Sequence, residues 1–217
     1  VIGAGSAGLV SSLIAAAVKA RVTLIERHKM GGDCLNTGCV PSKTLISSAR
    51  LAHQVGRAAE FGVDATLAGV DFGRVMSRVH QTIKAIEPHD SVERYTELGV
   101  DCIQGDAELI SPWEVRVGDR VISAPRIIIA TGAGPRIPPI PGLEQVPHTS
   151  SDDLWRLGEL PRRLLVLGGG PIGCELAQAF SRLGSEVSIV SRAAGLLPRE
   201  DSDVAEFITR RFGSENI

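Results

Sequence analysis

Apolar and polar residues along the chain follow two spacings, which alternate from one segment to the next. An Ala-rich apolar helix is expected from the first glycines to about Lys19, followed by a strand over 22–25. Helical spacing returns after residue 40, in Leu45, Ala49, Ala52 and Val55. Strands and helices that alternate in this way predict an α/β fold.

A long helical pattern lies between Asp71 and Leu98. Pro88 interrupts this pattern, so a break is expected there, and Asp90 with Glu93 has the spacing of a capping box for the restart. The histidines of this region, His80 and His89, are expected at the surface. The apolar stripe of the pattern comprises Phe72, Val75, Met76, Val79, Ile83 and Ile86, and it is interpreted as core.

Residues 100–130 have the pattern of short β segments. Gly118-Asp119 between two alternating runs predicts a hairpin. A strand over 126–130 then runs into Thr131-Gly132 and a proline-rich exit. The segments expected before it are Cys102–Gln104, Ala107–Ile110, Glu114–Val117 and Arg120–Ser123.

A glycine pattern at the start of the chain recurs after a strand at 164–167. Glycine in the first repeat permits a tight turn, a close approach of a pyrophosphate to a helix N-terminus, and close packing of helix and sheet. Glu26 ends the second strand of that repeat, where an acid accepts hydrogen bonds from a ribose diol. At a constant offset, Gly3, Gly5, Gly8 and Glu26 correspond to Gly168, Gly170, Gly173 and Ser191.

The fold class that follows is α/β, with two Rossmann-like dinucleotide-binding units and a small β-meander. The first domain is expected over 1–149 and the second over 150–217. Only Val1 and Ile2 precede the first glycine, so the opening strand is expected to be truncated. The chain is interpreted as a fragment of a longer polypeptide, with the second domain incomplete.

Two cysteines, Cys34 and Cys39, lie in a glycine-rich stretch from Gly31 to Lys43. A disulfide across so short a loop stabilises a fold by well under the ~3 kcal/mol of a fifteen-residue loop. A zinc site would need four ligands, and the other two cysteines are isolated in the sequence. A redox couple is favoured over a structural disulfide or half a metal site. Because Cys39 is expected at a helix N-terminus, which favours a thiolate, it is the better thiolate of the two.

The thirteen residues 31–43, with Cys34, Asn36, Gly38, Cys39 and Pro41-Ser42-Lys43 at defined positions, resemble the signature of the pyridine nucleotide disulfide oxidoreductases. This family includes mercuric reductases, dihydrolipoamide dehydrogenases and glutathione reductases. The resemblance implies that Cys39 is the charge-transfer thiol beside FAD and that Cys34 exchanges with the substrate. It also implies a proton-transferring His from the C-terminal interface domain of a partner subunit, which is absent here, so none of the five histidines is expected to be catalytic.

The cysteines follow the first unit directly, so that unit is expected to hold FAD and the second to hold NADP or NAD. Ser191 in place of an acid, followed by Arg192, favours a 2′-phosphate and hence NADPH. The resemblance further pairs Glu175 with Lys43 beside the flavin N5. The expected catalytic residues are Cys34, Cys39, Lys43 and Glu175, and no metal ligands are expected. The expected cofactor-binding residues are Gly3, Gly5, Ser6, Ala7, Gly8, Glu26, Arg27, Gly32, Asp33, Cys34, Lys43, Ala107, Thr131, Gly132, Gly168, Gly170, Pro171, Ile172, Gly173, Glu175, Ser191 and Arg192.

Composition restricts the function further. With 43% hydrophobic residues, 22% charged residues and a net charge of −2, the chain has neither the composition of a disordered protein nor a nucleic-acid-binding surface. No apolar run is long enough to span a membrane. Four cysteines, with Cys102 expected to be buried and inert and Cys174 a small buried residue, favour a reducing, cytoplasmic compartment.

The predicted function is transfer of electrons from NAD(P)H through FAD to the Cys34–Cys39 disulfide and on to a small disulfide or a metal ion, in a homodimer when full length. The run from Glu175 to Gly184 most resembles mercuric reductases, whereas Asp33 departs from the usual threonine. Two alternatives remain open. One is a dihydrolipoamide dehydrogenase that passes electrons from a dithiol to NAD⁺, and the other is a redox-sensing, nucleotide-binding module without disulfide turnover.

Overall fold

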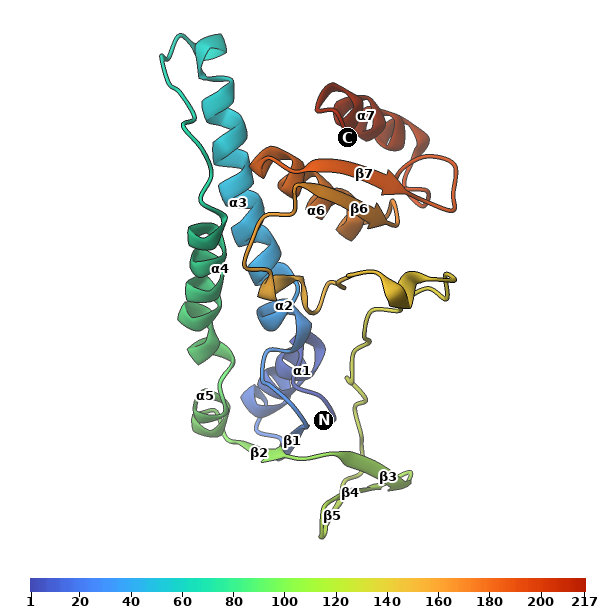
Figure 1. Ribbon diagram of the computed structural model, residues 1–217. Helices are drawn as coiled ribbons and strands as arrows, with labels where there is room; N and C mark the ends of the chain where they lie inside the picture. Colours follow the sequence, from blue (N-terminus) through green and yellow to red (C-terminus); the bar gives the residue numbers. More distant parts are fainter. The chain divides into compact units, whose positions relative to one another are not determined.

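The structure is a computed structural model that describes residues 1–217, and the chain packs into two compact units. The first unit comprises residues 1–41 and 80–155, and the second comprises 42–79 and 156–217 (Figure 1). This division follows packing, whereas the predicted boundary at 149/150 divides the chain by nucleotide site. The assignment of 1–149 and 150–217 to two nucleotides therefore stays a prediction.

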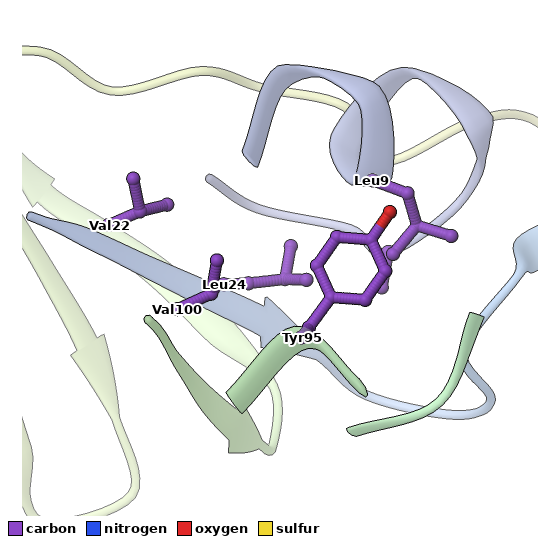
Figure 2. Packing of buried hydrophobic residues seen from close by; sticks show 6 residues of the cluster. Leu9, Val22, Leu24, Tyr95 and Val100 are labelled. Carbon is purple, nitrogen blue, oxygen red and sulfur yellow. The ribbon is translucent and has the colours of Figure 1, made fainter. Parts of the chain in front are cut away.

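The first unit is built around two parallel strands, β1 (Val22–Glu26) and β2 (Val100–Gln104). Helices α1 (Ser6–Ala17) and α5 (Val92–Glu97) both contact this sheet. Alternate residues of the strands point into one core with side chains of the two helices, as Figure 2 shows. The buried residues of this core are Ala4, Leu9, Val22, Leu24, Tyr95 and Val100.

The predicted meander is confirmed as an antiparallel sheet of β3 (Ala107–Ser111), β4 (Glu114–Val117) and β5 (Arg120–Ser123). Gly118, with φ +57°, lies in the predicted hairpin turn between β4 and β5. β2 lies outside the meander and pairs with β1 instead.

The strand expected over 126–130 is wrong. That segment forms only an isolated bridge between Ile129 and Ile2, with the Ile2 N–H donating to Ile128 O at 2.8 Å and the Ala130 N–H donating to Ile2 O at 2.8 Å. Ile2 is the one residue with which this segment pairs, so no regular ladder forms. Ile2 also bridges Ile25 of β1, so this short pairing fixes the entry to the first glycine turn.

The helix break at Pro88 is confirmed, but its predicted cap is not. α4 (Phe72–Ile86) ends before the 3₁₀ turn η2 (Glu87–Asp90), and α5 restarts the helix. The N-cap of α5 is Ser91, whose hydroxyl accepts the Arg94 N–H at 3.2 Å, and not Asp90. Ser91 has extended backbone dihedrals, as an N-cap requires, whereas Asp90 belongs to the 3₁₀ turn. His80 and His89 are exposed, as expected.

The second unit also contains two parallel strands. Its parallel strands are β6 (Arg163–Leu167) and β7 (Glu186–Val190), with α6 (Pro171–Leu183) between them and α7 (Ser202–Ser214) after them. α3 (Cys39–Gly56) begins in the first unit and continues into the second. The remaining elements are α2 (Gly32–Asn36) and the short 3₁₀ helices η1 (Ala58–Phe61), η3 (Leu143–Gln145) and η4 (Leu154–Arg156). None of the helices is both long enough and apolar enough to span a membrane.

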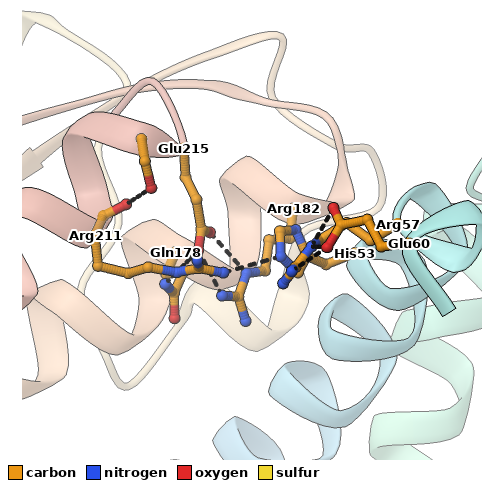
Figure 3. Close-up of polar contacts among 8 residues, drawn as sticks. His53, Arg57, Glu60, Gln178, Arg182, Arg211 and Glu215 are labelled. Atoms are coloured by element: carbon orange, nitrogen blue, oxygen red, sulfur yellow. Dashed lines mark hydrogen bonds and ion pairs between the residues drawn. The ribbon is translucent and has the colours of Figure 1, made fainter.

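A buried carboxylate joins the helices of the second unit. Glu215, after α7, accepts two hydrogen bonds from the Arg182 guanidinium of α6, at 2.8 and 2.7 Å, and forms an ion pair with Arg211, whose Nε lies 2.6 Å from Glu215 Oε1 (Figure 3). Burial acts to raise the pKa of Glu215, but the two arginines outweigh burial and lower it. The Arg211 guanidinium also donates to His53 Nε2 of α3 at 3.1 Å, so this imidazole nitrogen is an acceptor. Burial and the neighbouring arginines lower the pKa of His53, which keeps it neutral.

Candidate active site

The first glycine turn connects the β-bridges of Ile2 to the N-terminus of α1. Gly3 has φ +98°, a left-handed conformation that favours glycine, and its N–H donates to Ile25 O at 2.8 Å. A Cβ on Gly8 would overlap the carbonyl oxygen of Gly3, so glycine is required there for helix and turn to meet. The amides of the first turn of α1, among them those of Ser6 and Ala7, lie at the helix N-terminus, where backbone N–H groups have no intrahelical acceptor and can bind an anion.

The carboxylate of Glu26 lies against this turn. Its Oε2 accepts the Ala4 N–H at 2.7 Å, and its Oε1 accepts the His28 N–H at 2.8 Å. An ionised carboxylate has about four acceptor sites, so two remain for hydroxyl donors. This geometry holds the acid in place for a vicinal diol.

A second glycine pair closes over the first turn. Gly31 and Gly32 have φ of +86° and +53°, and a Cβ on Gly32 would lie 2.5 Å from the Cα of Gly5. The Gly31 N–H donates to Ala4 O at 2.9 Å. These close approaches leave only backbone in front of the α1 N-terminus, which suits a bulky anion such as a pyrophosphate.

Asn36 holds the glycine pair, although its side chain was not predicted to have a role. Its Nδ2 donates to Met30 O at 3.0 Å and to Gly32 O at 2.9 Å. The sequence does contain a signal for this role. An asparagine close to two glycines commonly donates its side-chain amide to nearby backbone carbonyls.

The two cysteines lie on either side of a folded-back turn between α2 and α3. The N–H groups of Thr37 and Gly38 both donate to Asp33 O, at 2.9 and 2.5 Å, and a Cβ on Gly38 would lie 2.8 Å from the same oxygen. Cys39 begins α3, as predicted. A hydrogen bond between the two cysteine side chains, together with burial, raises the pKa of Cys34, while a hydrogen bond with Ser6 opposes this effect. The two sulfur atoms are therefore neighbours, and Ser6 of the glycine turn contacts the couple.

Lys43 and Glu175 form the ion pair that the sequence resemblance predicted. Lys43 Nζ of α3 lies 2.6 Å from Glu175 Oε2 of α6. The side chains are 60% and 47% exposed, so the pair adds at most about 1 kcal/mol to stability. Together with Arg182, they line a small pocket of about 260 Å³.

The second glycine turn has the same backbone geometry as the first. Gly170 caps α6 with φ −79° and ψ 179°, against −78° and −173° for Gly5. The Gly168 N–H donates to Val190 O at 2.8 Å, which is the equivalent of the bond from Gly3 to Ile25. A Cβ on Gly173 would overlap the Gly168 carbonyl oxygen, as one on Gly8 would overlap that of Gly3. The repeat found in the sequence is therefore a repeat of structure.

The two turns differ at the position of the acid. Ser191 stands in the place of Glu26, and its hydroxyl accepts the Ala193 N–H at 3.3 Å. Arg192 is exposed. The segment that follows returns over the turn, with the Leu197 N–H donating to Gly169 O at 2.7 Å. The second turn thus lacks a fixed carboxylate and has an exposed cation beside it.

The other residues of the predicted site differ in their exposure and in their contacts with these turns. A Cβ on Gly3 would lie 3.1 Å from the Cα of Thr131, so Thr131 is beside the first turn. Ala107 packs against the cluster that contains Ile2 and Ile25. Gly132 has φ +68°. The exposed members of the predicted set include Arg27, Asp33, Pro171 and Ile172.

The other two thiols have different surroundings. Cys174 is buried, as predicted, and its sulfur donates to Gly169 O at 3.5 Å. Cys102 was predicted to be buried, but it is only half-buried, because β2 is paired on one side only and that edge is open. Burial raises the pKa of both thiols, and neither lies in the segment 31–43 that holds the other two cysteines.

The whole chain matches known proteins. A family model described as pyridine nucleotide-disulphide oxidoreductase matches residues 1–217. A mercuric reductase of Bacillus cereus is 35% identical over 217 residues, which is 100% of this chain and 34% of that protein. A dihydrolipoyl dehydrogenase of Chlamydia muridarum is 35% identical over 223 residues, which is 100% of this chain and 48% of that protein. The HOCl-induced flavoprotein disulfide reductase RclA of Escherichia coli superposes with a TM-score of 0.82 at 34% identity, over 99% of this chain and 46% of that structure. The chain thus spans between a third and a half of these relatives.

Proposed function

We propose, since this chain belongs to the pyridine nucleotide-disulphide oxidoreductase family, that the protein passes electrons from NAD(P)H through FAD to a disulfide formed by Cys34 and Cys39. The observation that carries the proposal is the adjacent pair of thiols on a turn that contacts a dinucleotide-type glycine turn through Ser6. In this proposal, residues 1–149 serve FAD and residues 150–217 serve the nicotinamide nucleotide.

The residues of the first turn fit FAD. The bare backbone at Gly5 and Gly32 leaves room for a pyrophosphate against the α1 N-terminus, and Glu26 is held ready for a ribose diol. Bound FAD would supply two-electron chemistry between a nicotinamide and a disulfide. Gly3, Gly5, Gly8, Gly32 and Glu26 would hold it.

The cysteines divide the chemistry between them. Cys39 begins α3, and a helix N-terminus favours negative charge, so Cys39 is assigned as the sulfur beside the flavin and Cys34 as the sulfur that exchanges with the substrate. A reduced pair attacks an external disulfide through one thiolate, and the other cysteine then resolves the mixed disulfide. The outer substrate would be a small disulfide or a metal ion that thiolates bind. A second candidate, oxidation of a dithiol by NAD⁺, is favoured by the 35% identity to dihydrolipoyl dehydrogenase.

An anaerobic titration with NADPH tests the relay. The flavin-loaded protein is expected to develop a long-wavelength absorption band, because a Cys39 thiolate donates charge to oxidised flavin once the disulfide is reduced. Cys39→Ser should lose this band. If the band never forms, or if Cys39→Ser leaves it unchanged, the protein is a redox-sensing, nucleotide-binding module and the relay is wrong.

Cofactor preference is expected to depend on Arg192. The second turn has Ser191 in place of a carboxylate, and an arginine there can bind a 2′-phosphate. Arg192→Ala should weaken NADPH binding about tenfold, the effect of one charge-assisted hydrogen bond, with NADH binding changed less than twofold. Arg163→Ala, at an exposed arginine at the start of β6, is the matched control. Equal losses for both nucleotides would reject the assignment, and isothermal titration of each nucleotide measures them.

The remaining proposals concern assembly and compartment. The full-length protein would be a homodimer, in which the partner contributes the proton-transferring His. Four cysteines without a disulfide framework suit a reducing, cytoplasmic compartment. Sedimentation of the full-length protein would test the first of these proposals.

A further inference from the structure

Trp155 is a buried side chain that neither the cysteine motif nor the glycine turns explain. It is 5% exposed at the centre of η4 (Leu154–Arg156). Its indole Nε1 donates to Thr37 O at 2.8 Å and to Ser151 O at 2.8 Å. Thr37 lies inside the turn between Cys34 and Cys39, so this tryptophan contacts the redox loop across 118 positions of sequence.

We propose that Trp155 is a positioning residue for the Cys34–Cys39 couple, which it fixes through the carbonyl group of Thr37. The inference rests on the proposed function, because it presumes that these two cysteines form a disulfide.

The peptide groups of Thr37 are held from both sides. The Thr37 N–H donates to Asp33 O at 2.9 Å, within the turn itself, and the Thr37 carbonyl accepts the indole N–H. The first bond alone leaves the turn free to move as one piece, whereas the second fixes it to another segment of the first unit. A disulfide needs the two Cα atoms within about 4.4–6.8 Å, so a fixed turn raises the effective concentration of one cysteine at the other.

Trp155 is itself fixed at its backbone. Its carbonyl oxygen lies 3.0 Å from His80 Nε2, and a carbonyl can only accept, so His80 is the donor. His80 and Trp155 are the two ends of the segment 80–155 of the first unit, and Thr37 lies four residues before the end of its other segment, 1–41. The cysteine turn is therefore bonded to Trp155, and Trp155 is bonded to His80, so the turn is connected to both ends of the segment 80–155. A tryptophan placed in this way can couple the redox state of the cysteine turn to the conformation of the segment 80–155.

The equilibrium between the flavin-loaded protein and dithiothreitol tests the proposal. In this exchange the Cys34–Cys39 disulfide becomes two thiols while dithiothreitol becomes its cyclic disulfide, so electrons and protons balance. Trp155→Phe keeps most of the buried ring and loses the N–H donor. The ratio of disulfide to dithiol, read by mass spectrometry after iodoacetamide labelling, should fall two- to tenfold at a fixed dithiothreitol ratio, the effect of one hydrogen bond.

Trp113 provides the matched control, because it is the only other tryptophan and is 60% exposed between β3 and β4. Trp113→Phe should leave the ratio unchanged. An unchanged or higher ratio in Trp155→Phe overturns the inference alone. Failure of the wild-type protein to form the Cys34–Cys39 disulfide overturns the proposed function, and the inference with it.

A second measurement does not depend on the folding of Trp155→Phe. In Trp113→Phe, Trp155 is the only indole, and its fluorescence should change when the couple is reduced by dithiothreitol. The change should be absent from the double variant with Cys34→Ser, which cannot form the disulfide. A fluorescence signal that is the same in both redox states, or that changes equally with Cys34→Ser, contradicts the proposal.

Discussion

Replacement of Cys34 by serine is expected to lower the NAD(P)H-dependent reduction of a disulfide substrate by ~10³-fold or more, as losses of catalytic nucleophiles do. The hydroxyl of serine cannot form a disulfide with Cys39 or a mixed disulfide with a substrate. A hydrogen bond with Cys39, together with burial, raises the pKa of the Cys34 thiol. In the variant, Cys39 keeps its place at the start of α3 but has no partner sulfur for exchange.

The measurement is steady-state turnover with an aromatic disulfide, together with rapid-mixing reduction of the flavin by NADPH. Flavin reduction should stay within about threefold of the wild type, because it precedes the cysteine step. Cys102→Ser is the matched control, since that half-buried thiol has a raised pKa and lies on β2, away from the turn. If Cys34→Ser retains turnover, or if Cys102→Ser loses it, the couple is assigned to the wrong cysteines.

Much of the first unit could be predicted from local patterns, because its elements are set by short-range rules. The glycine turn, the start of α3 at Cys39 and the break at Pro88 each follow from a few residues that restrict the backbone. The second turn was found as a repeat of the first, and its hydrogen bonds have the same partners at the same offset.

Features that depend on distant partners could not be predicted in the same way. The segment 126–130 has the composition of a strand, but it forms one bridge only, to the distant residue Ile2. Ser91 caps α5, and Asp90 does not, because Asp90 still belongs to the 3₁₀ turn. The bond from Trp155 to Thr37 spans 118 positions, and no local pattern predicts it.

Substitution of Lys43 by methionine is expected to slow flavin reduction by NADPH about a hundredfold, as the loss of one preorganised charge at a reacting centre does. Lys43 follows Cys39 by four residues on α3, so both lie on one face of that helix. Glu175 fixes the ammonium group at 2.6 Å, and a fixed cation stabilises negative charge that develops during hydride transfer without reorganisation. Glu175→Gln should leave the cation in place but less well fixed, and should cost about tenfold.

The free energy of unfolding separates this role from a structural one. Both side chains are about half exposed, so breaking the pair should change stability by less than about 1 kcal/mol in urea titrations. Arg57 and Glu60 form an exposed ion pair in the same unit, and Arg57→Met is the control that should leave hydride transfer unchanged. A Glu175 that acts only by fixing Lys43 predicts a double variant no slower than Lys43→Met. Losses that multiply would mean that the two side chains act independently, and equal losses in the Arg57 control would mean that any exposed charge has this effect.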